Sequence, residues 1–302
     1  MKTNFKSQLQ TAAVALLLGA TLFSSCKKDE EQEKVIPVRP VTPTSSKYIS
    51  KVFEYIPAPG QHINQASIGS PEQAQKLVGG TTNSVSLGGF GGYIIFGFDH
   101  SIVNQTGADL AIYGNPLAPP TPFAEPGIVM VSQDKNGNGL PDDEWYELAG
   151  SEYSKSTTIK NYEITYTNPK AATNVTWTDN QGKSGEVLNI SRGARNYYPL
   201  FAANQEKLTF KGTLLPSTLS TSGLITNAAF EWGYADSYSS GDNFATNQYN
   251  SFDISWAVDA TGKKVSLNTI DFVKVYTAQN VNAGFLGEIS TDIRGAVDLN
   301  IK

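Results

Sequence analysis

Side chains with oxygen atoms occur at alternate positions between residues 134 and 143, and they are of the types that bind hard cations. In order, the segment contains Asp134, Asn136, Asn138, the turn residue Gly139, Leu140, Asp142 and Asp143. This spacing is typical of calcium loops of the D-x-[DN]-x-[DN]-G type, in which alternate oxygens face one ion and a backbone carbonyl completes the near side. The sequence therefore predicts a Ca²⁺ site formed by these side chains and the carbonyl oxygen of Leu140.

The second half of this loop differs from an EF-hand. Trp145 occupies the position of the bidentate glutamate, and the flanking residues have the pattern of strands instead of helices. The alternative is a solvent-exposed Asn-Gly hairpin turn, but that does not explain an oxygen at every second position. The successive carboxylates of Asp142, Asp143 and Glu144 repel one another unless a cation is bound. We therefore expect a structural calcium loop between two strands.

Histidine and cysteine are too scarce for the usual zinc and nucleophile chemistry. His62 and His100 are the only histidines, Cys26 is the only cysteine, and neither histidine has a second ligand at zinc-site spacing. Nothing in the sequence indicates a Ser-His-Asp or Cys-His nucleophile. His100 follows Asp99 at the end of an apolar strand, which favours a structural role for its imidazole.

Paired carboxylates leave one class of catalysis open. A glycan hydrolase needs two acidic side chains that face one cleft about 5 to 10 Å apart. The candidates are Glu125, Glu147, Glu152, Asp236 and Glu288. Acidic residues are also common in turns and at strand ends, so a hydrolase is the alternative to a binding protein.

Aromatic and amide residues in the expected loops suggest a surface for a small-molecule or glycan ligand. The candidates are Tyr113, Asn115, Trp145, Tyr146, Tyr197, Tyr198, Trp232, Tyr234 and Asp236. Aromatic faces stack on sugar or corrin-like rings, and neighbouring amides and acids fix the orientation of the ligand. The alternative is that most of these rings pack in the core.

The first 25 residues have the order of a secretory signal peptide, with Lys2 and Lys6, an apolar run and small residues before Cys26. The apolar run is shorter than the roughly 20 residues of a membrane span. The segment from Leu22 to Cys26 resembles a bacterial lipobox, and a lipid-bearing cysteine needs no disulfide partner. We therefore expect residues 1–25 to be removed and Cys26 to anchor the chain in a membrane.

Residues 26–46 are expected to form a tether. An acidic run at 29–31 follows a pair of lysines, and the stretch 35–46 is rich in proline, which favours an extended spacer. The acidic run resembles the export signal of Bacteroidota surface lipoproteins, which implies display on the outer face of the outer membrane. The alternative is a solvated tether that carries no export signal.

Residues 47–302 are expected to form one all-β domain. One helix of about two turns is predicted between Ser70 and the closing pair Gly79-Gly80, where serine caps the helix and proline takes its first position. Apolar runs between Gly, Asn and Pro turns predict strands at 48–56, 85–87, 93–98, 110–113, 128–132, 144–148, 162–167, 174–178, 207–211, 230–234, 252–258, 269–277 and 296–301. This pattern favours a two-sheet β-sandwich of the jelly-roll type.

The charge of the chain argues against nucleic acid as a partner. The formal net charge is −5, and it becomes more negative when Lys2 and Lys6 are removed with the signal peptide. The chain contains no basic cluster that would match a phosphate backbone.

Five segments together resemble a family of Bacteroidota cell-surface proteins. They are SLGGFGGYIIFGFDH, ADLAIYGNPL, EPGIVMVSQDKNGNGLPDDEWYELAGSEY, FEWGYADS and FDISWAVD, within residues 53–299. The resemblance implies a fold like that of galactose-binding jelly rolls. It also implies a gene position near outer-membrane uptake systems, including those for cobalamin, and hence a TonB-dependent transporter as a partner.

The sequence thus predicts a lipid-anchored, surface-exposed β-sandwich with a structural calcium ion. We expect it to act without catalysis, as a ligand-binding or accessory module for the uptake of a glycan or a cobalamin-type nutrient. The alternatives are a carboxylate-dependent glycan hydrolase and a structural or adhesive surface protein.

Overall fold

The computed structural model describes residues 36–302, which form one compact unit. The predicted signal peptide, Cys26 and the acidic run at 29–31 lie outside the described residues. In the part of the chain that the structure describes, no helix is both long enough and apolar enough to cross a membrane.

Strands dominate the structure, and the strands within each sheet pair in antiparallel fashion. They are β1 (Lys51–Ile56), β2 (Val85–Ser86), β3 (Tyr93–Val103), β4 (Leu110–Tyr113), β5 (Gly127–Ser132), β6 (Trp145–Leu148), β7 (Ile159–Thr167), β8 (Val175–Asp179), β9 (Ser184–Val187), β10 (Lys207–Leu214), β11 (Leu219–Ser220), β12 (Thr226–Asn227), β13 (Asn250–Phe252), β14 (Ala257–Val258), β15 (Thr269–Thr277), β16 (Asp292–Ile293) and β17 (Gly295–Asp298). The helical elements are α1 (Pro71–Gln75), α2 (Phe244–Asn247) and the 3₁₀ turns η1 (Leu200–Ala202), η2 (Ile254–Trp256) and η3 (Gly284–Leu286). The predicted all-β class is confirmed.

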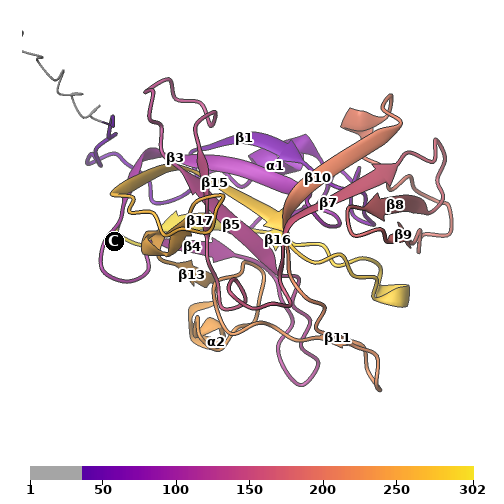
Figure 1. Ribbon diagram of the computed structural model, residues 1–302. Coiled ribbons are helices and arrows are strands. Elements are labelled where there is room, and N and C mark those ends of the chain that lie inside the picture. The colour runs from indigo at the N-terminus through magenta and orange to yellow at the C-terminus, as the bar shows by residue number, and fades with distance from the viewer. Residues whose placement is uncertain (1–35) are drawn as a thin grey trace, which may run out of the picture. The chain divides into compact units, whose positions relative to one another are not determined.

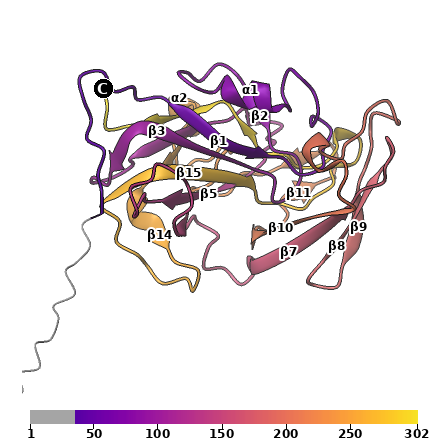
Figure 2. The ribbon, with the colours of Figure 1, turned by 90° about the horizontal axis from the view of Figure 1, so that it is seen from above.

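Two of the sheets form the layers of a sandwich. One has six strands in the order β1-β3-β15-β5-β6-β14, and the other has three in the order β13-β4-β17. The chain crosses from β3 to β4 and back to β5, and later from β13 to β14 and from β15 to β17. Figure 1 shows β3 and β15 above β4 and β13, and Figure 2 looks down on β1, β3, β15 and β5. Repeated crossing between layers is typical of jelly-roll sandwiches.

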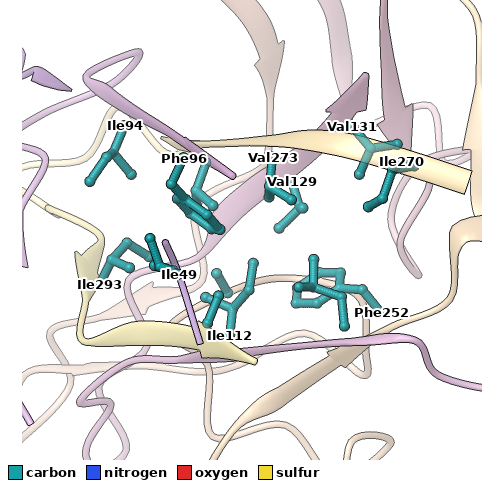
Figure 3. Close-up of a cluster of buried hydrophobic side chains, with 14 of the residues drawn as sticks. Ile49, Ile94, Phe96, Ile112, Val129, Val131, Phe252, Ile270, Val273 and Ile293 are labelled. Atoms are coloured by element: carbon teal, nitrogen blue, oxygen red, sulfur yellow. The ribbon is translucent and has the colours of Figure 1, made fainter. Parts of the chain in front are cut away.

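The main hydrophobic core fills the space between these two layers. Its members include Ile49, Ile94, Phe96, Ile112, Val129, Val131, Phe252, Ile270, Val273 and Ile293, each at most 1% exposed. Figure 3 shows the side chains of β3, β5 and β15 facing those of β4 and β13. Burial of each such side chain contributes about 1.5 to 3 kcal/mol, so this core is what holds the two layers in place.

A four-stranded sheet, in the order β10-β7-β8-β9, has a core of its own beside the sandwich. Alternate residues of β7, namely Tyr162, Ile164 and Tyr166, pack there against Tyr197 and Tyr198. This sheet lies at the right of Figure 1. Its strands β7 and β10 also form one wall of the cavity described below.

The helix predicted after Ser70 is present as α1, although it is shorter than predicted, and the Oγ of Ser70 accepts the N–H of Gln73 at 3.2 Å. The second helix, α2, is not predicted from the sequence. It is a single turn between Asn243 and Gln248, which both have a left-handed backbone with φ of 51° and 60°.

Two of the predicted strands are wrong. Residues 230–234 form a loop, because Gly233 has a φ of 85° and approaches Gly150 too closely for a strand to continue. The strand predicted at 252–258 breaks at Asp253, whose carboxylate accepts the N–H of Ser255 and begins η2. Alternating apolar residues therefore mark buried positions here without marking a strand.

Part of the predicted tether packs against the domain. Arg39 donates from Nη1 to the carbonyl of Phe98 at 2.8 Å and from Nη2 to Asp271 Oδ1 at 3.1 Å. Asp271 is buried at an irregularity in β15, where the register with β3 shifts. Pro37 lies beside Gly137 of the predicted calcium loop. The packed structure therefore starts before residue 47.

Candidate functional site

The predicted calcium loop connects β5 to β6 and is held by hydrogen bonds between its side chains and its own backbone. Asp134 is 5% exposed, and its carboxylate accepts the N–H groups of Asn138 at 3.0 Å and Gly139 at 2.9 Å. The side-chain oxygens of Asn136 and Asn138 accept the N–H groups of Asn138 at 2.9 Å and Leu140 at 2.8 Å. These bonds turn alternate side chains toward one another.

Asp142 closes the loop from the other side. Its carboxylate oxygens accept the amide Nδ2 groups of Asn136 at 3.2 Å and Asn138 at 2.9 Å. Asp143 accepts the N–H of Lys135 at 3.0 Å, which ties the two ends of the loop together. The loop thus brings four of the predicted side-chain ligands together.

The donor set of the loop fits calcium, because carboxylate, amide and carbonyl oxygens are the ligands of hard cations. Among residues 36–302, no cluster of three or more His, Cys, Asp or Glu side chains is arranged to hold a metal ion. The predicted set in the loop does not need such a cluster, since two of its ligands are amide oxygens and one is a backbone carbonyl.

A cavity of about 590 Å³ lies on the face of the six-stranded sheet that points away from the main core. Residues of β5, β6 and β15 form one side, β7 and β10 form another, and the turn at 258–262 borders it. Its lining includes Trp145, Glu147, Tyr153, Lys160, Thr213 and Asp259. The volume falls within the range of about 300 to 1,000 Å³ that is usual for ligand pockets.

Glu147 and Lys160 form the charged centre of this cavity. Glu147 accepts the Thr213 hydroxyl at 2.6 Å, and its other oxygen lies 3.6 Å from Lys160 Nζ. Burial raises the pKa of Glu147, against the opposing effect of Lys160, and burial lowers the pKa of Lys160. Lys160 Nζ lies 3.0 Å from the ring centre of Tyr153 and has no hydrogen-bond partner among the described residues.

Four of the predicted ligand-binding rings lie in the interior. Tyr146, Tyr197, Tyr198 and Tyr234 are each at most 4% exposed. Tyr197 and Tyr198 belong to the core beneath the four-stranded sheet, and the Tyr234 hydroxyl accepts the N–H of Glu152 at 2.9 Å. These four rings are covered by other residues, which agrees with the alternative that most of the predicted rings pack in the core.

The remaining predicted aromatic residues lie in separate places. Trp145 lines the cavity. Tyr113 packs against Tyr249 with ring centres 5.4 Å apart, and Trp232 packs against Trp256 with ring centres 4.7 Å apart. Trp145 is therefore the one predicted aromatic residue that the structure brings to the cavity.

A second polar group is an acidic cluster that consists of Glu125, Asp236, Glu288 and Asp292. Two of the predicted ligand-binding residues lie here, Asp236 within the cluster and Asn115 in contact with it. The backbone N–H of Asn115 donates to Asp236 Oδ1 at 2.8 Å, and its side-chain Nδ2 donates to Asp292 Oδ2 at 3.1 Å. The cluster unites three of the acids that the sequence offers for glycan hydrolysis. The other two lie elsewhere, Glu147 at the cavity and Glu152 beside Lys155 at 2.7 Å.

His100 is a structural histidine, as predicted. Its side chain is fully buried, with Nδ1 2.7 Å from Asp99 Oδ1 and Nε2 2.8 Å from Asp298 Oδ2. Both ring nitrogens are engaged, so neither is left for a metal or a nucleophile. The ring fastens β3 to the end of β17.

The sequence did not reveal several residues of these two sites. Lys160 and Thr213 lie on β7 and β10, and they reach the cavity only because the two sheets pack together. Asp292 lies on β16, whose two residues are too few for a periodic pattern. Tyr153 is the last residue of the quoted segment that contains the calcium loop, but nothing in its neighbourhood distinguishes it from a core tyrosine.

Comparison with known proteins provides no family and no relative. No protein-family model matches the chain, and no curated protein is significantly similar to it. The resemblance to Bacteroidota surface proteins therefore remains an expectation from the sequence.

Proposed function

We propose that this protein is a lipoprotein on the outer face of the outer membrane, which captures a hydroxyl-rich ligand such as a glycan for an uptake system. The observation that carries the proposal is the cavity of about 590 Å³ with an aromatic and charged lining. The calcium loop stabilises the domain, and no catalytic step is required. A TonB-dependent transporter is the proposed recipient of the ligand.

The chemistry of the cavity supports a polar ring-shaped ligand. Trp145 and Tyr153 offer aromatic surface, which stacks on the apolar faces of sugar rings. Lys160 offers ammonium donors, and Glu147 and Asp259 offer acceptors within the same lining. A few polar groups among aromatic residues are what fix the orientation of a small ligand.

The location is proposed from the first 31 residues alone. Cys26→Ala should prevent lipid labelling and release the protein from membranes. Replacement of Asp29, Glu30 and Glu31 by alanine should leave the protein lipidated but protected from protease added to intact cells. Retention of the first variant in the membrane, or unchanged protease access in the second, would contradict the proposed anchor or address.

Ligand binding is tested by isothermal titration calorimetry of the mature chain with a panel of oligosaccharides and with cyanocobalamin. We expect an oligosaccharide to bind and Trp145→Ala to weaken the affinity by about tenfold, or about 1.4 kcal/mol. Trp232→Ala is the matched control, because Trp232 packs against Trp256 and does not line the cavity. If cyanocobalamin binds and no oligosaccharide does, the ligand is a corrin and not a glycan. Equal effects of the two tryptophan variants would contradict the site.

A glycan hydrolase is the second candidate, and one observation favours it. Burial raises the pKa of Glu147, whereas hydrogen bonds from Thr261 lower the pKa of Asp259. Two carboxyl groups with opposite shifts that line one cavity resemble the acid and base of a glycosidase. Release of reducing sugar by wild type and its loss in Glu147→Gln would favour the hydrolase, whereas binding without product would favour the capture protein.

A further inference from the structure

The acidic cluster is assembled from segments that are far apart in the sequence. Glu125 precedes β5, Asp236 follows the bridge between Gly127 and Ala235, and Asp292 lies on β16. Backbone groups hold these segments together: Asp292 N–H donates to Asp236 Oδ2 at 2.9 Å, and Glu125 N–H donates to the carbonyl of Asp236 at 3.0 Å. The fold thus places the carboxylates side by side by means of main-chain hydrogen bonds.

These carboxylates have no basic partner. Asp236 is 0% exposed, Asp292 is 5% exposed and Glu288 is 6% exposed. No ion pair among residues 36–302 includes any of the four acids of the cluster. Unpaired buried charge is costly, so something must neutralise this cluster near neutral pH.

Two buried oxygens of the cluster, Asp292 Oδ1 and Glu288 Oε2, have no hydrogen-bond partner among the described residues. Asp292 Oδ2 is held by Asn115, but Asp292 Oδ1 is buried and has no hydrogen-bond partner among the described residues. A cation would satisfy the oxygen and neutralise the charge together.

Two residues at the edge of the cluster are accessible to solvent. Asn115 is exposed, and Glu125 is only half-buried by its accessible surface. Glu125 uses Oε1 to accept the N–H of Ser290 at 2.8 Å. Its other oxygen accepts no hydrogen bond from the residues that the structure describes, so it is free to turn toward a ligand.

We propose that Glu125, Asp236 and Asp292 form a second cation site, which binds a divalent ion of the calcium type independently of the loop at residues 134–143. Oxygen ligands alone select a hard cation. A buried site in which few waters fit suits calcium better than magnesium, which keeps several waters. Asp292 Oδ1 and Glu125 supply carboxylate ligands, Asp236 supplies charge, and amide or backbone oxygens complete the shell. Calcium sites commonly include such neutral oxygens, so three converging carboxylates are not required.

The test counts bound calcium in the mature protein by elemental analysis after equilibration with calcium and removal of free ions. We expect wild type to hold one ion more than Asp292→Asn, which preserves the shape of the side chain but removes its charge. Asp134→Ala should also lose one ion, from the loop, and the double variant should lose both. Asp292→Asn with the full wild-type content would overturn the second site. Loss of an ion in Asp292→Asn but not in Asp134→Ala would keep the second site and remove the loop from the proposed function.

A measurement on wild type avoids any folding defect of the variants. Infrared spectroscopy in chelator near neutral pH should show the carbonyl band of protonated carboxyl groups, and saturating calcium should remove it. A band that persists in calcium would mean that protons alone neutralise the cluster, which overturns the inference. Glu125→Gln, at a half-buried side chain, is the second variant and should weaken calcium binding at this site at least tenfold without a change at the loop.

Discussion

The calcium loop and the acidic cluster both collect carboxylates, but they differ in sequence separation and in solvent exposure. The loop takes its oxygens from ten consecutive residues, 134–143, and exposes Asn136, Asn138 and Asp142 to solvent. The cluster takes its carboxylates from distant segments and buries Asp236 and Asp292. The loop satisfies oxygens of Asp134 with its own backbone N–H groups, whereas two buried oxygens of the cluster have no hydrogen-bond partner among the described residues.

This difference separates the energetic roles of the two regions. Solvent screens the charges of the loop, so they repel one another only weakly without an ion, and bound calcium would add stability with the logarithm of its concentration above the dissociation constant. Charges in the cluster interact through a medium of lower dielectric constant, where repulsion between carboxylates is several times stronger than in water. Removal of a counter-charge should therefore destabilise the protein more in the interior than at the loop.

The largest loss of stability is expected when the histidine partner of a buried acid is removed. His100→Ala leaves Asp298 Oδ2 buried without its hydrogen bond to Nε2, whereas Oδ1 keeps the N–H of Asn300, and loss of the hydrogen bond and of the buried ring together should cost about 3 kcal/mol or more. Urea unfolding followed by fluorescence measures this loss. Glu206→Ala, at an exposed acid, is the control and should change stability by less than about 0.5 kcal/mol. A loss below about 1 kcal/mol for His100→Ala would remove the distinction between buried and exposed carboxylates.

The second effect is a pH dependence that arises from the cluster. Burial raises the pKa of Glu288 from 4.5 to about 7 in the folded protein. Folding thus favours the protonated form, so its stabilising contribution is fully present below about pH 4.5 and is lost as the pH rises through about 7. In chelator, the free energy of unfolding should fall over this interval by on the order of 3 kcal/mol from this group.

Glu288→Gln isolates this contribution, because glutamine has nearly the same shape and does not titrate. Unfolding in urea at a series of pH values should give a flatter profile for Glu288→Gln than for wild type, while Glu206→Gln should follow wild type. Equal slopes for all three proteins would mean that Glu288 titrates as an ordinary acid.

The third effect concerns the loop and calcium. At a calcium concentration a hundred times the dissociation constant, the bound ion stabilises the folded state by about 2.7 kcal/mol. Chelator should therefore lower the melting temperature by a few degrees for a domain of this size. Asp134→Ala should lower it by a similar amount and reduce the further response to chelator. A wild-type protein that melts identically in chelator and in millimolar calcium would show that the loop is a polar hairpin.

The smallest effect is expected at the segment before β1. Arg39→Gln removes a partly exposed ion pair with Asp271, in which the arginine side chain is 39% exposed, and it should cost about 1 kcal/mol. Hydrogen exchange should show faster exchange of the Ser101 amide, which donates to the Arg39 carbonyl at 2.8 Å. Arg192→Gln, at an exposed arginine far along the chain, should leave that amide unchanged.

Short-range sequence patterns predicted the structural features that depend on neighbouring residues. The sandwich class, α1, β4 at 110–113, β15 at 269–277 and the internal bonding of the calcium loop all follow from short-range signals. The alternation of large apolar residues at 230–234 was misleading, because burial of a loop gives the same pattern as burial of one strand face.

The cavity and the acidic cluster depend on long-range packing. Glu147 and Lys160 meet because β6 and β7 belong to different sheets that pack together, and no spacing in the sequence encodes that contact. Glu125 and Asp236 are among the acidic candidates that the sequence offers for one cleft. Their proximity to Asp292, however, depends on the pairing of β16 with β2. Sequence alone identified these residue types without identifying their neighbours.

The contact between Arg39 and Asp271 also bears on tension in the chain. If Cys26 carries a lipid, any pull on the captured ligand is transmitted between membrane and domain through the residues just before β1. That tension reaches the fold first at Arg39, whose partner Asp271 also accepts the N–H of Asp134 at 2.8 Å. Asp271 lies in β15, at the centre of the six-stranded sheet. The load would thus enter at an inner strand of the sandwich, beside the calcium loop, instead of at the edge strand β1.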